Sequence, residues 1–127
     1  MNSGPGVSVK VREHRDCWVL DVEGQADFEE GGVLRSAMDE TRAKPLPAMV
    51  IDLSALTFGD TAFLHWLLTA RRAHEEAGTR LILAGPLRAQ VLRLLTVTGT
   101  LDHFTVAEDA PAALTLLASP GEAQQEG

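Results

Sequence analysis

The fold is decided by residues 49–68, which read MVIDLSALTFGDTAFLHWLL. Residues 49–53 form a short and almost continuous apolar run, which is typical of a central strand covered on both faces of a parallel sheet. A loop is expected over residues 54–59. An apolar stripe at helical spacing then predicts a helix over residues 61–77, which Gly78 would end.

On both sides of this stretch, the apolar residues alternate between the period of a strand and the period of a helix. Two alternating runs near the N-terminus predict an antiparallel hairpin. The other expected elements and their signals are a helix over 33–41 behind an Asp27–Glu30 capping box, a strand over 81–84, a helix opened by Pro86 and ended at Gly99, a strand over 104–106 and a helix capped by Asp109. The order β-β-α-β-α-β-α-β-α predicts an α/β fold with a mostly parallel sheet and a hairpin at its start, formed by strands over 7–11 and 17–22.

Length and composition indicate one globular domain. The chain has 127 residues, of which 45% are hydrophobic and 23% are charged, as is usual for a single domain of this kind. Residues 1–6 and 119–127 are small or polar and are expected to be flexible. The domain itself is therefore predicted to span residues 7–118.

The charge of the chain disfavours several classes of partner. Eleven basic and eighteen acidic residues give a formal net charge of −7, which would repel a phosphate backbone, so nucleic acid is not an expected partner. The chain has no apolar stretch of the roughly 18 residues that a membrane span needs. The N-terminus also lacks the features of a secretion signal. We therefore expect a cytoplasmic protein that does not insert into a membrane.

The sequence contains little that predicts catalysis. His65 and His74 lie nine residues apart, which is not the spacing of a helical metal pair. Cys17 is the only cysteine and sits in an apolar strand, where we expect it to pack as a small hydrophobic residue. Gly85 stands alone where a nucleotide-binding loop would need several glycines. We expect no enzyme activity, no metal and no cofactor; a small-molecule binder or an enzyme built from the strand-end loops is a minor alternative.

Asp60 and Thr61 bring a carboxylate and a hydroxyl together at the start of the long helix. Asp60 has the position of an N-cap, which accepts a hydrogen bond from a backbone N–H one turn into the helix. Thr61 would then be the first helical residue, with its hydroxyl exposed at a helix N-terminus that tolerates a phosphate. Phosphorylation there would add a charge of roughly −1.5 to −2.

These features together resemble the STAS domain. Its signature has an apolar strand ending in Asp-Leu, a loop, and then Asp-Ser/Thr-x-Gly-Leu opening a helix, and residues 50–68 are similar to it. Residues 22–27, 80–99 and 104–110 resemble the flanking parts of the family pattern, so the resemblance extends over about residues 7–118. It implies a STAS-like fold with a mixed, mostly parallel sheet of about five strands and about four helices packed mainly on one face.

The best-known members of the family are bacterial anti-sigma factor antagonists. The resemblance implies a protein that binds an anti-sigma factor which is also a serine/threonine kinase, so that the sigma factor is released and transcription changes. The kinase would phosphorylate Thr61, the hydroxyl directly after the motif Asp60, and binding would be lost. A PP2C-type phosphatase would reverse the modification. Self-association is left open.

The resemblance also implies a surface for the partner. Its residues form the loop before the helix and the exposed start of the helix: Phe58, Gly59, Asp60, Thr61, Ala62, Phe63, His65 and Trp66. Phe63 stands where the family motif has glycine, and His65 and Trp66 replace residues that are often small or aliphatic. Because Phe63 and Trp66 are three residues apart, they lie on adjoining faces of the helix. Either one ring covers the sheet, or the rings form an aromatic patch specific for a partner.

A second class of function is a constitutive accessory or scaffold subunit that is not phosphorylated. STAS-like modules also occur in lipid-transport ATPase complexes, where the Asp-Thr pair is seen as well. They also form the tails of anion transporters, which the absence of an attached membrane segment disfavours. Neighbouring genes for a kinase-like anti-sigma factor or for a transporter would discriminate between the two classes.

Overall fold

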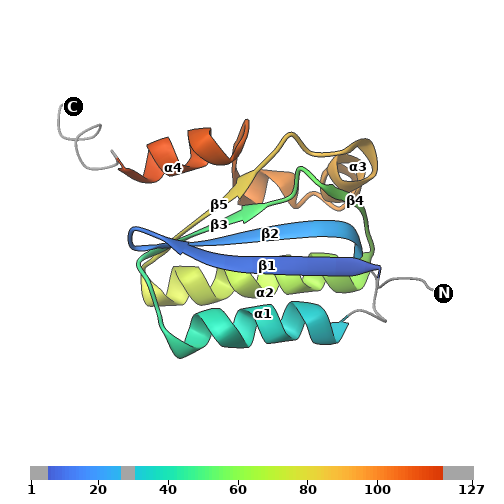
Figure 1. Cartoon of the computed structure of the whole chain (residues 1–127). Coiled ribbons are helices and arrows are strands. Elements are labelled where there is room, and N and C mark those ends of the chain that lie inside the picture. The colour runs from blue at the N-terminus through green and yellow to red at the C-terminus, as the bar shows by residue number, and fades with distance from the viewer. Residues whose placement is uncertain (1–5, 27–30, 119–127) are drawn as a thin grey trace.

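The computed structural model of the protein describes residues 6–26 and 31–118 (Figure 1). These residues form six strands, four α-helices and a short 3-10 helix. The bounds in chain order are β1 Val7–His14, β2 Cys17–Ala26, α1 Gly31–Ala43, β3 Ala48–Asp52, β4 Leu56–Gly59, α2 Thr61–Ala77, β5 Arg80–Ala84, α3 Ala89–Val97, η2 Leu101–His103, β6 Thr105–Ala107 and α4 Ala110–Ala118. The predicted capping box at Asp27 and Glu30 and, apart from Gly6, the predicted flexible ends lie outside the described residues.

The strands form one mixed sheet in the order β1-β2-β3-β5-β6, with β4 paired to the end of β2. Only the β1–β2 hairpin is antiparallel; the pairs β2–β3, β2–β4, β3–β5 and β5–β6 are parallel. This arrangement confirms the predicted fold class. Because all the parallel strands point the same way, their carboxyl ends meet at one edge of the sheet.

Strand β4 corrects the prediction of a loop before the long helix. Residues 56–59 pair with residues 24–26 of β2, with a shift in register between Gly24 and Gln25. The N–H of Gly24 also donates to the carbonyl of Ala55 at 3.0 Å. A strand of four residues is too short for its alternation to be recognised in the sequence, and its formation depends on the end of β2, which is distant along the chain.

The helices pack mainly on one face of the sheet, as the family resemblance implied. In Figure 1, α1 and α2 lie together on one side of the sheet and α4 lies on the other. The larger core cluster joins the sheet to α1, α2 and α3, and its fully buried members include Leu20, Ile51, Leu67, Leu83 and Leu95. The smaller cluster lies under α4 and includes Cys17, Val19, Val50, Ile82 and Ala113.

Two helix ends follow their local sequence signals, as predicted. Gly78 ends α2 in the left-handed conformation with φ of 75°, which glycine adopts without a steric penalty. At the start of α4, the Asp109 carboxylate accepts a hydrogen bond from the Ala112 N–H at 2.9 Å.

The prediction that Pro86 opens a helix is wrong. Helix α3 begins only at Ala89, after an extended Arg88. The N–H of Gly85 is bound to the carbonyl of Ala107 at 2.9 Å, and a Cβ atom on Gly85 would lie only 2.9 Å from the Leu87 nitrogen. The chain is therefore held in a tight turn at the end of β5, which delays the helix by one turn.

His74, in the last turn of α2, should make the stability of the fold depend on pH. Its Nδ1 atom lies 2.6 Å from the Thr79 hydroxyl, and burial lowers the pKa of the imidazole. Below the usual histidine pKa of about 6.5 the unfolded chain then binds more protons than the folded chain, so the free energy of unfolding should fall as the pH drops.

Urea denaturation of the protein and of a His74→Gln variant between about pH 7.5 and pH 5.5 would check this. The wild type should lose more stability than the variant over this range. Parallel curves for the two proteins would contradict the prediction.

Candidate partner-docking site

The start of α2 is fixed at the edge of the sheet where the parallel strands end. The Asp60 carboxylate oxygen Oδ1 accepts hydrogen bonds from the backbone N–H groups of Ala62 at 2.9 Å and Phe63 at 3.0 Å. The Asp60 N–H donates to the carbonyl of Ala26, at the end of β2, at 3.1 Å. Asp60 is thus the predicted N-cap, and it also ties the helix start to the sheet.

Thr61 is the first residue of α2, and its side chain is exposed. Within the described part of the chain, its hydroxyl makes no hydrogen bond. Asp60 already occupies the N–H groups of Ala62 and Phe63, two of the free donors in the first turn. The Thr61 hydroxyl is therefore accessible, on a backbone that the Asp60 cap fixes at the edge of the sheet.

The end of β4 is held by Gln90 of α3, a residue that no sequence pattern singles out. The Gly59 N–H donates to Gln90 Oε1 at 2.8 Å, and Gln90 Nε2 donates to the Gly59 carbonyl at 2.9 Å. One side-chain amide thus satisfies both backbone groups of Gly59, as a neighbouring strand would. A glutamine in a helix carries no sequence signal for this contact, because the contact depends on how α3 packs against β4.

Phe63 is fully buried, with 0% of its surface exposed. Its ring lies against Gly59, where an added Cβ atom would overlap with it. The buried ring corrects the expectation that Phe63 contacts a partner: it covers the sheet instead. Gly59 is also buried, so neither residue offers a side-chain surface for docking.

Trp66 and His65 remain on or near the surface. The half-buried Trp66 ring stacks on Phe63 with a centroid separation of 6.1 Å, and its Nε1–H donates to the Leu34 carbonyl of α1 at 3.0 Å. His65 is exposed. We define the docking surface as the predicted residues that stay accessible, namely Phe58, Asp60, Thr61, Ala62, His65 and Trp66.

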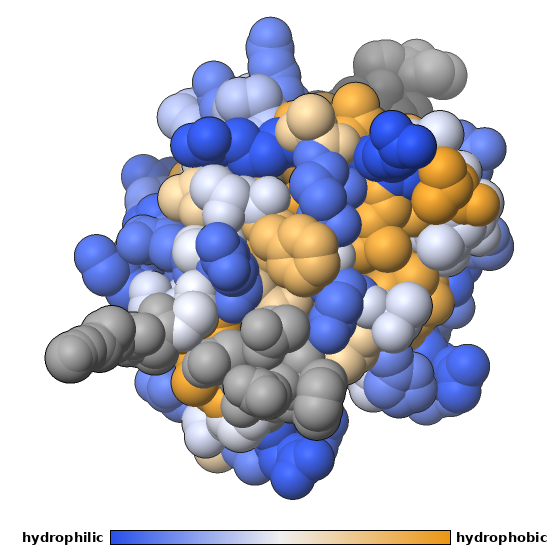
Figure 2. All heavy atoms as spheres, turned by 90° about the vertical axis from the view of Figure 1, so that its right-hand side faces the viewer, coloured by the Kyte–Doolittle hydropathy of each residue, from blue (hydrophilic) through white to orange (hydrophobic). Residues whose placement is uncertain are grey.

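Exposed hydrophobic side chains also lie at this end of the molecule, near α3. Figure 2 shows the face at the carboxyl ends of the strands, with hydrophobic surface gathered in its upper part, level with α3. Three of the exposed large hydrophobic residues are Phe58 (39%), Leu92 (41%) and Val106 (39%). Leu92 and Val106 line an open groove of about 780 Å³ together with the acidic Asp102 and Glu108. An apolar surface of this kind suits a protein partner.

Removing the Asp60 cap should weaken the start of α2. Replacing Asp60 by alanine leaves the N–H groups of Ala62 and Phe63 without their acceptor, and we expect a loss of about 1–2 kcal/mol in the free energy of unfolding. Asparagine caps a helix as well as aspartate, so Asp60→Asn is the matched control and should cost little. Chemical denaturation of both variants would check this, and equal losses would show that the cap hydrogen bonds do not set the stability.

No metal centre or membrane helix was found in the part of the chain that the structure covers. Within residues 6–26 and 31–118, no three His, Cys, Asp or Glu side chains are grouped so that they could hold a metal ion. None of the helices in these ranges is both long enough and apolar enough to cross a bilayer.

Comparison with known proteins adds sequence and structural similarity over most of the chain. The sequence profile of the STAS domain matches residues 8–113. The anti-sigma-F factor antagonist RsfB of Mycobacterium tuberculosis is 25% identical over 111 residues, which cover 87% of this chain and 91% of RsfB. The crystal structure of an anti-sigma factor antagonist from Mycobacterium paratuberculosis superposes with a TM-score of 0.75 at 27% identity, covering 90% of this chain and 97% of that one. A Moorella thermoacetica RsbS variant shares the fold with a TM-score of 0.76 at 23% identity and the same coverage.

Proposed function

Because the chain belongs to the STAS domain family, we propose that it is an anti-sigma factor antagonist that is switched off by phosphorylation at Thr61. The observation that carries this proposal is the exposed Thr61 hydroxyl, which lies directly after the Asp60 cap at the fixed start of α2. The similarity to RsfB and to the Mycobacterium paratuberculosis antagonist supports the choice of partner class.

The proposed partner is an anti-sigma factor with serine/threonine kinase activity, bound at the docking surface in the bacterial cytoplasm. In the unmodified state the partner covers Thr61, and its sigma factor is released. The kinase then transfers the γ-phosphoryl group of ATP to the Thr61 oxygen: the new P–O bond forms, the bond to the β-phosphate breaks, ADP leaves, and the hydroxyl proton passes to a base of the kinase. A PP2C-type phosphatase would hydrolyse the phosphate and restore binding.

The structure gives a physical reason why the phosphate would end binding. A phosphate at a helix N-terminus is normally neutralised by the free backbone N–H groups of the first turn. Here Asp60 already accepts from the N–H groups of Ala62 and Phe63, so the phosphate would have to rely on other donors. Burying such a dianion beneath a partner is costly unless the partner supplies matching cations.

Incubation with the cognate kinase and ATP, followed by mass spectrometry, tests the proposal. The wild type should gain one phosphate at Thr61, and Thr61→Ala should gain none while it still binds the anti-sigma factor. Thr69→Ala is the matched control, because Thr69 is another exposed threonine of the same helix, and it should be phosphorylated like the wild type.

Phosphorylation at another residue would contradict the switch at Thr61. Binding to a transport ATPase instead of an anti-sigma factor in a pull-down would favour the alternative accessory or scaffold subunit, which needs no phosphorylation.

A further inference from the structure

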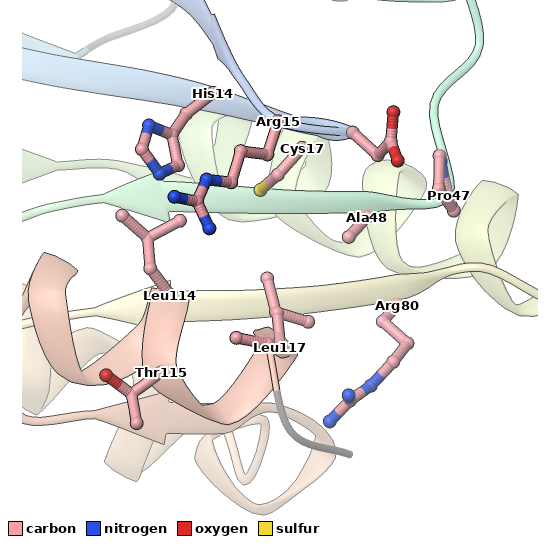
Figure 3. Close-up of a pocket in the computed structure, with 11 residues that line it drawn as sticks. His14, Arg15, Cys17, Pro47, Ala48, Arg80, Leu114, Thr115 and Leu117 are labelled. Carbon is pink, nitrogen blue, oxygen red and sulfur yellow. The ribbon is translucent and has the colours of Figure 1, made fainter. Parts of the chain in front are cut away.

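A second candidate site lies at the opposite edge of the sheet from Thr61. It is an open cavity of about 610 Å³, a size typical of small-molecule sites. Its lining comes from the turn between β1 and β2, the first residues of β3 and β5, and α4, as Figure 3 shows. Since the parallel strands begin at this edge and end at the other, a ligand here would not touch the docking surface.

Two arginines of the cavity lining form no salt bridge within the described part of the chain. Arg15 and Arg80 both line the cavity, with His14 beside Arg15 in the hairpin. Within residues 6–26 and 31–118, the salt bridges involve other basic residues, and neither of these two arginines has a carboxylate within 4.0 Å. Among the described residues of the lining, Asp16 is the one acidic side chain beside the two arginines, so this part of the lining has a net positive charge on a chain whose total is −7.

Arg15 adopts a backbone conformation that normally favours glycine. Its φ of 53° makes it the one non-glycine residue with positive φ in the described part of the chain. The left-handed region costs such a residue roughly 1–2 kcal/mol, and two-residue hairpin turns usually place Gly, Asn or Asp there. An unfavourable backbone conformation at a residue whose guanidinium lines a cavity indicates a functional role for that side chain.

The rest of the lining is largely apolar. Leu114 and Leu117 of α4 approach from one side, and Ala48 and Cys17 of the sheet lie opposite them (Figure 3). These residues belong to or pack against the smaller core cluster. The cavity thus combines an apolar body with guanidinium groups at its rim.

We propose that this cavity binds an aliphatic carboxylate, with the alkyl chain of the ligand against Leu114 and Leu117 and its carboxylate on Arg15. Guanidinium groups bind carboxylates through paired, charge-assisted hydrogen bonds. The apolar lining would bury the alkyl chain of the ligand away from water. Arg80 lies at the other end of the cavity, where its guanidinium donates to the Leu116 carbonyl at 3.4 Å, and it adds positive charge to the rim (Figure 3). This inference is independent of the proposed switch at Thr61.

Titration of the ¹⁵N-labelled protein with decanoate, followed by NMR, tests the proposal. Amide signals from the hairpin turn and α4 should shift, and decanol and acetate, which lack the charge or the chain, should each bind at least about tenfold more weakly. Arg15→Gly should weaken decanoate binding by a similar factor, yet unfold at the same temperature as the wild type or higher, because glycine relieves the left-handed backbone. Arg93→Gln, which removes an exposed arginine of α3, is the charge-matched control and should bind normally.

Three results would overturn the proposal. The first is the absence of shifts with decanoate in the cavity residues. The second is equal binding of decanol, or of decanoate to Arg15→Gly, which would show that the arginine does not select the ligand. The third is a change of the same signals on dilution without ligand, which would mean that a second copy of the chain covers the cavity.

Discussion

Replacing Phe63 by alanine should lower the free energy of unfolding by about 3–5 kcal/mol, a large part of the stability of a domain of this size. The ring is fully buried and stacks on Trp66 with a centroid separation of 6.1 Å. Its removal would leave a cavity between the start of α2 and the sheet that the fixed backbone around Asp60 cannot close. Urea denaturation followed by circular dichroism measures the loss.

Gly59 gives this prediction a sharper second test. A Cβ atom at Gly59 would overlap with the Phe63 ring, so Gly59→Ala alone should destabilise the protein by about 1–3 kcal/mol through overpacking. In a Phe63→Ala background the ring is gone and the same methyl group fits. The double-mutant cycle should therefore show a coupling energy of at least about 0.5 kcal/mol. Additive losses would contradict the packing described for this pair.

The same contact shows how the fold accommodates the departure from the family motif. The motif glycine is replaced by Phe63, whose ring occupies the space beneath Gly59. The substitution is therefore accommodated beneath the end of β4, and the proposed docking surface is formed by other residues. In the wild type the two residues depend on each other: a large ring at position 63 requires glycine at position 59.

The elements that could be predicted from the sequence are those whose signals lie within the element or directly beside it. Helix α2 begins and ends at the predicted residues because Asp60 caps it and Gly78 stops it, and both signals lie within one turn of the helix ends. The hairpin and the parallel strands follow from their own apolar patterns. The STAS resemblance added a mixed sheet of about five strands with helices mainly on one face, and the docking surface that it implies stays a prediction.

What the sequence could not predict depends on contacts between distant segments. Strand β4 forms only because the end of β2 offers it a partner. The Gln90 clamp on Gly59 requires α3 to pack against β4, and the start of α3 depends on a turn held to Ala107. Helical spacing could place Phe63 and Trp66 on adjoining faces, but it could not decide which ring was buried. In each case the deciding contact joins segments that are distant in sequence or depends on how the helices pack on the sheet.

Replacing Thr61 by glutamate should weaken binding of the anti-sigma factor by roughly 100-fold, equivalent to about 2.8 kcal/mol. The new carboxylate would lie beside Asp60, whose Oδ1 already takes the N–H groups of Ala62 and Phe63. It would therefore enter the interface without those donors, and an unpaired charge in a desolvated contact is strongly unfavourable. Isothermal titration calorimetry with the purified partner measures the change.

Thr61→Gln separates charge from size, because glutamine has the shape of glutamate without its charge. It should bind within about fivefold of the wild type, and its affinity should change little with salt. Glutamate in the first turn of a helix is favoured by the helix dipole, so Thr61→Glu should be at least as stable as Thr61→Gln, and its weaker binding cannot come from unfolding. Equal affinities for the two variants would mean that the partner does not cover Thr61 and that a phosphate there could not act by charge alone. A much larger loss for the phosphorylated protein than for Thr61→Glu is expected, because the phosphate carries about twice the charge.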